Sequence, residues 1–127
     1  MKRIGILTSG GDCSGMNAAI RAAVRTALSN QVEIIGFRKG YVGMMKSDWL
    51  QLDTKAVSGL MQRGGTFLQS ARSDEFKTPE GQRNTLDNLR QLAIDGLIIL
   101  GGDGSLNGAL ALHRLGFPVI GIPASID

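Results

Sequence analysis

Apolar and polar positions along this chain follow two different periods in turn, which predicts strands separated by helices. Short apolar runs typical of buried strands precede longer stretches with an apolar residue at every third or fourth position, as in an amphipathic helix. We expect strands at residues 3–8, 32–37, 97–100 and 118–122, a brief extended piece at 66–68, and helices at 16–29, 53–61, 81–93 and 106–115. This alternation indicates a parallel sheet covered by helices on both faces.

The tripeptide Gly-Gly-Asp occurs twice, at residues 10–12 and 101–103, each time between a predicted strand and a predicted helix. A glycine turn that leads into a helix exposes backbone N–H groups and the positive end of the helix dipole, which suits a phosphate. A carboxylate beside the phosphate is useful if a divalent cation such as Mg²⁺ accompanies it. Both turns fall at the C-terminal ends of the strands, where ligands of such sheets bind. The pattern therefore predicts a nucleotide–magnesium site at this edge.

The residues of these turns have distinct expected roles at such a site. Gly11 in the first turn, and Gly102 and Gly104 in the second, would let the backbone approach the phosphates without a steric clash. We expect Ser105 to cap the following helix and to donate to a phosphate oxygen, and Asp103 to bind Mg²⁺. The competing interpretation is that each turn only satisfies local backbone geometry. Two copies at one edge of a sheet favour the binding site.

Two charged residues outside the turns are candidates for phosphoryl-transfer chemistry. Arg72 follows the extended piece at 66–68, and its guanidinium group could bridge phosphates. Asp127 follows the last predicted strand, where a carboxylate could accept the proton of an attacking hydroxyl group. A solvated surface arginine and a carboxylate with no catalytic role remain open alternatives at these positions.

Composition and missing motifs exclude several other classes of protein. A hydrophobic content of 43% and a charged content of 20% are typical of a globular domain. The net charge is +3 with no run of five like charges, so we expect no nucleic-acid partner. No apolar stretch reaches the ~20 residues that span a bilayer, so we expect no membrane partner. With Cys13 as the single cysteine and no signal peptide before the first strand, we expect a cytoplasmic protein.

Three common nucleotide-binding signatures are also absent from the sequence. There is no G-x-x-x-x-G-K-[ST], neither glycine cluster reads G-x-G-x-x-G, and the protein-kinase motifs are missing. The glycine turns therefore belong to a nucleotide site of another type.

Several segments resemble bacterial 6-phosphofructokinases, and together they run through the whole chain in order. They are residues 2–12, 15–21, 63–66, 70–72, 101–105 and 121–127. The resemblance implies a Rossmann-like open, mainly parallel sheet with helices on both faces. It also implies that residues 1–127 are the N-terminal ATP-binding portion of an enzyme whose second lobe is absent. The last predicted strand leads to the same expectation, because no helix returns to cover the sheet after it.

The resemblance implies transfer of the γ-phosphoryl group of Mg-ATP to the 1-hydroxyl of fructose 6-phosphate. The residues implied to bind ATP are Gly11, Arg72, Ser73, Gly102, Asp103, Gly104 and Ser105. Asp103 would also bind Mg²⁺. Ser125 and Asp127 would meet the sugar phosphate, with Asp127 as the base for its hydroxyl. Arg21 and Arg25 match positions that bind the effector ADP at a subunit contact, in a family that forms homotetramers.

Departures from the family pattern and other interpretations qualify this picture. Gly104 and Ala124 stand where pyrophosphate-using relatives carry Asp and Lys, which favours ATP. Thr54 stands where effector-responsive members carry Arg, and Arg21 with Arg25 could equally form a solvated helix face. Two alternatives stay open: a related Gly-Gly-Asp-Gly kinase acting on NAD or a lipid, and a non-catalytic nucleotide-binding module. We expect the 127-residue chain alone to be inactive.

Overall fold

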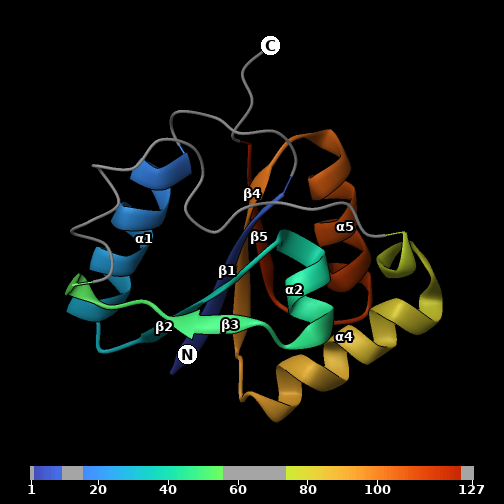
Figure 1. The fold of residues 1–127 in the computed structure, drawn as a ribbon, viewed down its shortest axis with the longest axis horizontal. Helices are drawn as coiled ribbons and strands as arrows, with labels where there is room; N and C mark the ends of the chain where they lie inside the picture. Colours follow the sequence, from blue (N-terminus) through green and yellow to red (C-terminus); the bar gives the residue numbers. More distant parts are fainter. Residues whose placement is uncertain (1, 10–15, 56–73, 124–127) are drawn as a thin grey trace.

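A mainly parallel sheet forms the centre of the molecule. In a computed structural model that describes residues 2–9, 16–55 and 74–123, five strands pair in the order β3-β2-β1-β4-β5 (Figure 1). They are β1 Arg3–Ser9, β2 Glu33–Phe37, β3 Trp49–Gln51, β4 Gly96–Gly101 and β5 Val119–Pro123. Neighbouring strands are parallel except β2 and β3, which are antiparallel. The predicted open, mainly parallel α/β fold is confirmed.

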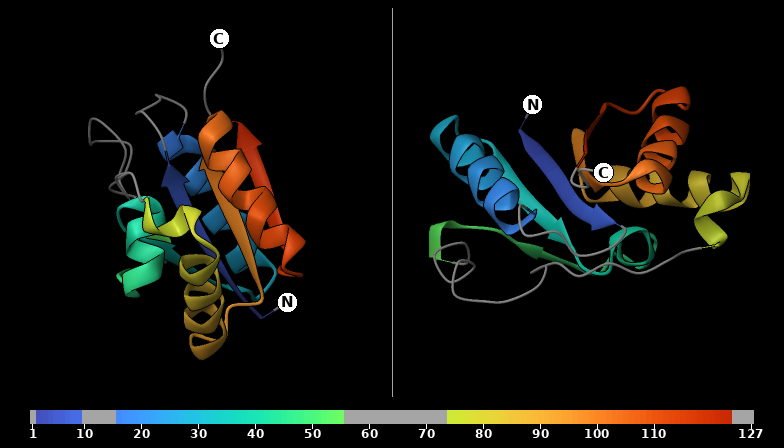
Figure 2. Two further views of the ribbon diagram at one scale, coloured as in Figure 1. Left: turned by 90° about the vertical axis from the view of Figure 1, so that its right-hand side faces the viewer. Right: turned by 90° about the horizontal axis from the view of Figure 1, so that it is seen from above.

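Helices cover both faces of this sheet, with α1 on one side and α2, α4 and α5 on the other (Figure 2). Their bounds are α1 Met16–Ser29, α2 Gly40–Lys46, α4 Pro79–Gln91 and α5 Asp103–Arg114, with the short 3-10 helix η2 Glu75–Lys77 before α4. Successive strand residues point to opposite faces. Ile6 of β1 accordingly belongs to a core cluster with Ile20 of α1, whereas Leu7 belongs to a second cluster with Leu89 of α4 and Leu112 of α5.

The long helices begin and end close to where the apolar spacing predicted them. Helix α1 has the predicted bounds, and α4 begins two residues earlier than expected because Thr78 supplies its cap. The Thr78 hydroxyl accepts from the backbone N–H of Gly81 at 3.0 Å, and Pro79 occupies the first helical position, where its missing N–H costs nothing. The predicted helix at 53–61 begins at Thr54, and its part beyond Lys55, like the piece at 66–68, lies outside the described residues.

Two elements between residues 40 and 51 were not predicted. Helix α2 follows Lys39, whose φ of 59° is left-handed, and its first residue, Gly40, also has a positive φ of 58°. The chain then returns as β3, which extends the sheet beyond β2. Both elements are too short for a hydrophobic period to show, and the glycines of α2 read as turn signals.

The α-helices α1, α2, α4 and α5 share one way of ending. A residue with positive φ follows each of these four helices, and the next backbone N–H donates to a carbonyl oxygen five residues earlier, as in the Schellman motif. The left-handed residues are Gln31 after α1, Ser47 after α2, Ala93 after α4 and Gly116 after α5. Glycine is the residue best suited to this conformation, and among these four positions only the one after α5 carries it.

Candidate functional site

The second glycine turn joins β4 directly to α5. Strand β4 ends at Gly101, and α5 begins at Asp103 with Gly102 as its N-cap. The backbone N–H of Leu106 donates to the carbonyl oxygen of Gly102 at 3.0 Å, which is the first helical bond. The helix therefore starts three residues before the predicted position 106. Ser105 lies inside its first turn, and the prediction that Ser105 caps the helix is wrong, because extended Gly102 already occupies the cap position.

The start of α5 differs from the start of α4 in a way that matters for anions. Thr78 at the N-cap of α4 accepts a hydrogen bond from Gly81, so its side chain satisfies one of the first N–H groups of that helix. Gly102 has no side chain that could do the same for α5. The N–H groups of an uncapped first turn are the donors that bind phosphate at helix N-termini.

The glycines of this turn serve different purposes. A β-carbon at Gly101 would collide with the carbonyl oxygen of Ser9 and with the Ser105 side chain, so glycine is required there for packing. A β-carbon at Gly104 would meet no heavy atom of the described residues within 4 Å. Packing among these residues does not explain glycine at position 104. Room for a β-carbon beside a helix start with no side-chain cap is compatible with a bound ligand.

Three neighbouring strands end together at this edge of the sheet. Ser9 at the end of β1 is the register partner of Gly101, and Gly101 is in turn the partner of Pro123 at the end of β5 (Figure 1). The last described residues before two undescribed segments, Ser9 and Pro123, therefore lie on either side of Gly101, where the second glycine turn begins.

Much of the predicted site lies outside the described residues. This applies to Gly11, Arg72, Ser73, Ser125 and Asp127, and to the side chain of Asp103. The described structure includes the backbone of residues 101–105 and places Ser105 in a buried position.

Arg21 and Arg25 lie on α1, across the sheet from α5. Arg21 is partly buried and Arg25 is exposed, whereas Ile20 and Val24 beside them are fully buried toward the sheet. The two arginines are one helical turn apart, as predicted, and belong to a surface separate from the glycine turn of α5.

A tyrosine that no sequence pattern singled out reaches the glycine turn. The hydroxyl of Tyr41, on α2, donates to the backbone carbonyl oxygen of Ser105 at 2.6 Å. The ring of Tyr41 stacks on Phe76 with a centroid distance of 4.2 Å and an interplanar angle of 22°. Burial raises the pKa of the Tyr41 phenol well above its ordinary value of 10.0, so the hydroxyl stays protonated and remains a donor near neutral pH.

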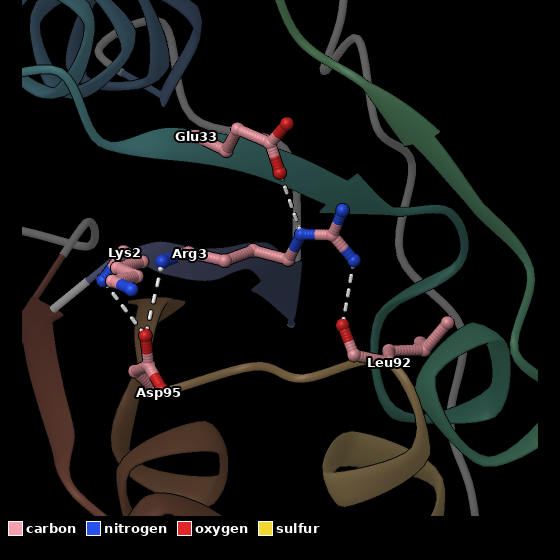
Figure 3. Close-up of polar contacts among 5 residues, drawn as sticks. All are labelled: Lys2, Arg3, Glu33, Leu92 and Asp95. Carbon is pink, nitrogen blue, oxygen red and sulfur yellow. Dashed lines mark hydrogen bonds and ion pairs between the residues drawn. The ribbon is translucent and has the colours of Figure 1, made fainter.

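The opposite edge of the sheet holds a cluster of polar contacts around Arg3 (Figure 3). The Arg3 guanidinium donates from Nε to Glu33 Oε2 at 2.8 Å and from Nη1 to the carbonyl oxygen of Leu92 at 2.6 Å. Asp95 Oδ2 accepts from the backbone N–H groups of Lys2 at 2.7 Å and of Arg3 at 3.1 Å. These two hydrogen bonds lower the pKa of the Asp95 carboxyl group. The contacts join β1 to β2 and to the connection between α4 and β4.

The described residues contain neither a candidate metal cluster nor a membrane-spanning helix. No group of three or more His, Cys, Asp or Glu residues in the described ranges could hold a metal ion. No helix there has the length and apolar character needed to cross a membrane.

Comparison with known proteins gives a consistent result. A sequence model of the family described as Phosphofructokinase matches residues 3–127. A relative from Streptococcus mutans, named "ATP-dependent 6-phosphofructokinase", is 52% identical over 127 residues, which are 100% of this chain and 38% of that protein. A relative of the same name from Lactobacillus johnsonii is 54% identical over 127 residues, covering 100% of this chain and 40% of that protein. The chain thus spans about two fifths of the length of these relatives.

Solved structures share the fold. The phosphofructokinase of Saccharomyces cerevisiae matches with a TM-score of 0.90 and 34% identity, over 100% of this chain and 20% of that chain. A pyrophosphate-dependent phosphofructokinase from Marinobacter aquaeolei matches with a TM-score of 0.78 and 21% identity, over 97% of this chain and 33% of that chain. At that identity the second match concerns the fold alone.

Proposed function

The chain belongs to the phosphofructokinase family, and on that premise we propose that the whole protein is an ATP-dependent 6-phosphofructokinase. It would transfer the γ-phosphoryl group of Mg-ATP to the 1-hydroxyl of fructose 6-phosphate and release fructose 1,6-bisphosphate. The observation that carries the proposal is the start of α5 at Gly102 without a side-chain cap, in a chain about half identical to relatives of that name. No described residue lies within 4 Å of a β-carbon at Gly104.

The phosphates of ATP would bind across the two glycine turns. The backbone N–H groups of residues 102–105 lie at the positive end of the α5 dipole and would donate to the phosphates. Gly11 in the first turn would approach the transferring phosphate. Arg72 and Ser73 would lie along the nucleotide, where a guanidinium group can neutralise charge as the phosphoryl group moves.

Mg²⁺ would bind at the start of α5. Asp103 follows the N-cap directly and offers a carboxylate, the oxygen donor that Mg²⁺ prefers. When bound, the ion would neutralise phosphate charge, while the helix start holds the nucleotide.

The sugar phosphate would bind on the other side of the turn. Ser125 and Asp127 follow β5, whose last residue Pro123 pairs with Gly101, so both belong to a segment that leaves the sheet beside the ATP turn. The Asp127 carboxylate would accept the proton of the 1-hydroxyl as its oxygen attacks phosphorus, which makes the hydroxyl a better nucleophile.

ATP is the proposed phosphoryl donor because of the space at Gly104. A nucleotide is longer than pyrophosphate and needs room beyond the two phosphates. A β-carbon at Gly104 would meet none of the described residues within 4 Å, which is compatible with such room. Ala124 contributes no charge at the position that matches a Lys of pyrophosphate-using relatives.

The proposal also includes an effector site, a subunit arrangement and a cellular location for the enzyme. Arg21 and Arg25 on α1 would bind the phosphates of ADP at a subunit contact of a homotetramer. Thr54, in place of the arginine of effector-responsive members, would weaken the response to ADP. The enzyme would act in the cytoplasm, as glycolytic enzymes do. Neither alternative, an NAD or lipid kinase or a non-catalytic module, is favoured by any observation on this chain.

Activity of the whole protein with defined substrates tests the proposal. We expect ADP release from ATP that depends on both Mg²⁺ and fructose 6-phosphate, with fructose 1,6-bisphosphate as product and no turnover when pyrophosphate replaces ATP. The 127-residue chain assayed alone should give no turnover. A whole protein that binds ATP but does not phosphorylate fructose 6-phosphate would overturn the proposal.

A further inference from the structure

We propose that the side of β5 that faces away from α5 is a docking surface for a helix of the same polypeptide, contributed by the part of the whole protein outside residues 1–127. The surface consists of Ile120 and Ile122, and we call it the outer face of β5. Such a contact would join the two parts of the protein, and it does not depend on which reaction the protein catalyses.

The two sides of β5 differ in how they are packed. On the α5 side, a β-carbon at Gly121 would lie 2.6 Å from Cδ2 of Leu106, so α5 leaves no room there. Val119, on the same side, packs against the core cluster that includes residues of α4 and α5. On the other side, Ile120 is 63% exposed and Ile122 is 38% exposed. Within the described residues, this strand therefore has one covered face and one uncovered apolar face.

The outer face of β5 continues into the core on the α1 side of the sheet. Ile120 is the register partner of Ile98, and Ile122 is the partner of Leu100. Leu100 is buried in the cluster that includes residues of α1, and Ile98 packs against that cluster while staying partly exposed. The four side chains form one aliphatic strip across β4 and β5, buried at Leu100 and exposed at Ile120. Because parallel sheets are covered on both faces, this strip lacks a partner among the described residues.

The topology of the sheet indicates what kind of helix can cover this strip. The chain moves from β1 to β2 with α1 on one face, and from β4 to β5 in the opposite direction with α5 on the other face (Figure 2). Both connections therefore have the same hand, as the preference for right-handed crossovers requires. A further parallel strand beside β5 would continue in the second direction, so its helix would lie on the α5 side. We therefore infer that the outer face of β5 receives a helix that does not lead to a strand beside β5.

The rest of the same polypeptide is the occupant that the length of the relatives favours. The 127 residues are 38% of the Streptococcus mutans relative and 40% of the Lactobacillus johnsonii relative, so a whole protein of that length has most of its residues elsewhere. A tethered segment binds at a high effective concentration, whereas a second copy or a separate protein has to overcome the entropy of association. Two uncharged isoleucines fit the apolar side of an amphipathic helix.

Solvent access to position 120 in the whole protein tests whether the face is covered. In Ile120→Cys, the thiol should react with a water-soluble maleimide at least about ten-fold more slowly than in the control Asp87→Cys, because reaction at a covered site requires local opening. Asp87 is exposed on α4. Mass spectrometry of the peptide that holds the new cysteine gives each rate separately from that of Cys13. Equal rates at the two positions would overturn the proposal.

Photo-crosslinking of the whole protein identifies the occupant. A benzophenone amino acid at position 120 should cross-link to a peptide outside residues 1–127 and leave a product with the mass of one chain. That peptide should have apolar residues at helical spacing. Cross-links only within residues 1–127, or a product with the mass of two chains, would refute the assignment of the occupant.

A second cross-linking position tests the topology. Leu110 of α5, one turn after Leu106, is 43% exposed on the side where a strand beside β5 would bring its helix. The benzophenone group at position 110 should therefore react with a different peptide from the one found at position 120. One peptide at both positions would contradict a separate helix on the outer face of β5. None of these measurements uses catalysis, so a whole protein without 6-phosphofructokinase activity would refute the proposed function and leave the docking surface to be decided by labelling and cross-linking.

Discussion

The N-terminal and C-terminal edges of the sheet differ in how their polar groups are arranged. At the N-terminal ends of the strands, the Arg3 side chain pairs with Glu33, and the Asp95 carboxylate accepts from the backbone N–H groups of Lys2 and Arg3 (Figure 3). At the C-terminal ends, the N-cap of α5 is Gly102, which provides no side-chain cap, and no described residue lies within 4 Å of a β-carbon at Gly104. The contacts at the first edge connect parts of the fold, and the second edge is the one proposed to bind a ligand. Substitutions at the two edges should therefore affect different measurements.

The largest expected effect is at Asp127, the proposed catalytic base. Asp127→Ser in the whole protein should lower kcat by about 10²- to 10⁴-fold, the usual contribution of a general base. ATP affinity and melting temperature should change little. The control is Asp87→Ser, on the exposed side of α4, which should keep full activity. An Asp127→Ser enzyme with normal kcat would remove Asp127 as the base.

A substitution at Gly101 should break the C-terminal edge as a structure. In Gly101→Ala the new β-carbon collides with Ser9 and Ser105, so we expect a loss of about 1–3 kcal/mol in the free energy of unfolding, as in overpacked cores. ATP binding should weaken as well, because the turn has to move. Chemical denaturation measures the first effect. Unchanged stability would show that the collision is relieved without cost.

At the N-terminal edge, a substitution at one helix end should raise stability without affecting ATP binding. Ala93, after α4, has a φ of 58°, and glycine adopts this conformation more readily than alanine. Ala93→Gly should raise the free energy of unfolding by about 0.5–1 kcal/mol and leave the KM for ATP unchanged. The matched opposite change, Gly116→Ala after α5, should destabilise by a similar amount, because φ there is 90°. Changes of equal sign in the two variants would contradict this account.

The smallest expected effect is the pH dependence of the Asp95 contacts. The backbone N–H groups of Lys2 and Arg3 lower the pKa of Asp95 below its ordinary value of 3.8. A lowered folded-state pKa contributes stability that is present above the ordinary value and is lost as the pH falls through the lowered pKa. Asp95→Ala should therefore unfold more easily at neutral pH, and the difference should vanish in strong acid. Thermal melts across this range measure it, and a constant difference would contradict the assignment.

The sequence predicted the regular parts of the fold and missed the parts built by packing. Helix α1 shows the apolar period over its whole length and has the predicted bounds. Helix α2 has seven residues, and its Gly43 is so close to the carbonyl of Arg38 that a β-carbon would not fit. A required glycine in such a short helix looks like a turn in the sequence, so α2 could be found only from the three-dimensional contacts.

The sequence predicted the location of the candidate site better than its detailed geometry. Strand and glycine patterns placed the turn at residues 101–105 correctly, but α5 begins earlier than predicted because its glycines have low helix propensity and hide its first turn. Tyr41 could not be predicted, since its bond to Ser105 spans 64 residues. The same reason hid the Arg3 contacts, whose partner Glu33 is 30 residues away.

The most direct test of the difference between the edges is the variant Gly104→Ala in the whole protein. Because its β-carbon meets no atom of the described residues within 4 Å and alanine favours helix, the free energy of unfolding should stay the same or rise by about 0.5–1 kcal/mol. The same β-carbon would occupy the space proposed for the nucleotide, so the affinity for Mg-ATP, measured by calorimetric titration, should fall at least about ten-fold, or ~1.4 kcal/mol. A stable protein with weakened ATP binding is the predicted result. Unchanged ATP affinity in a stable Gly104→Ala protein would contradict the assignment of this turn as the nucleotide site.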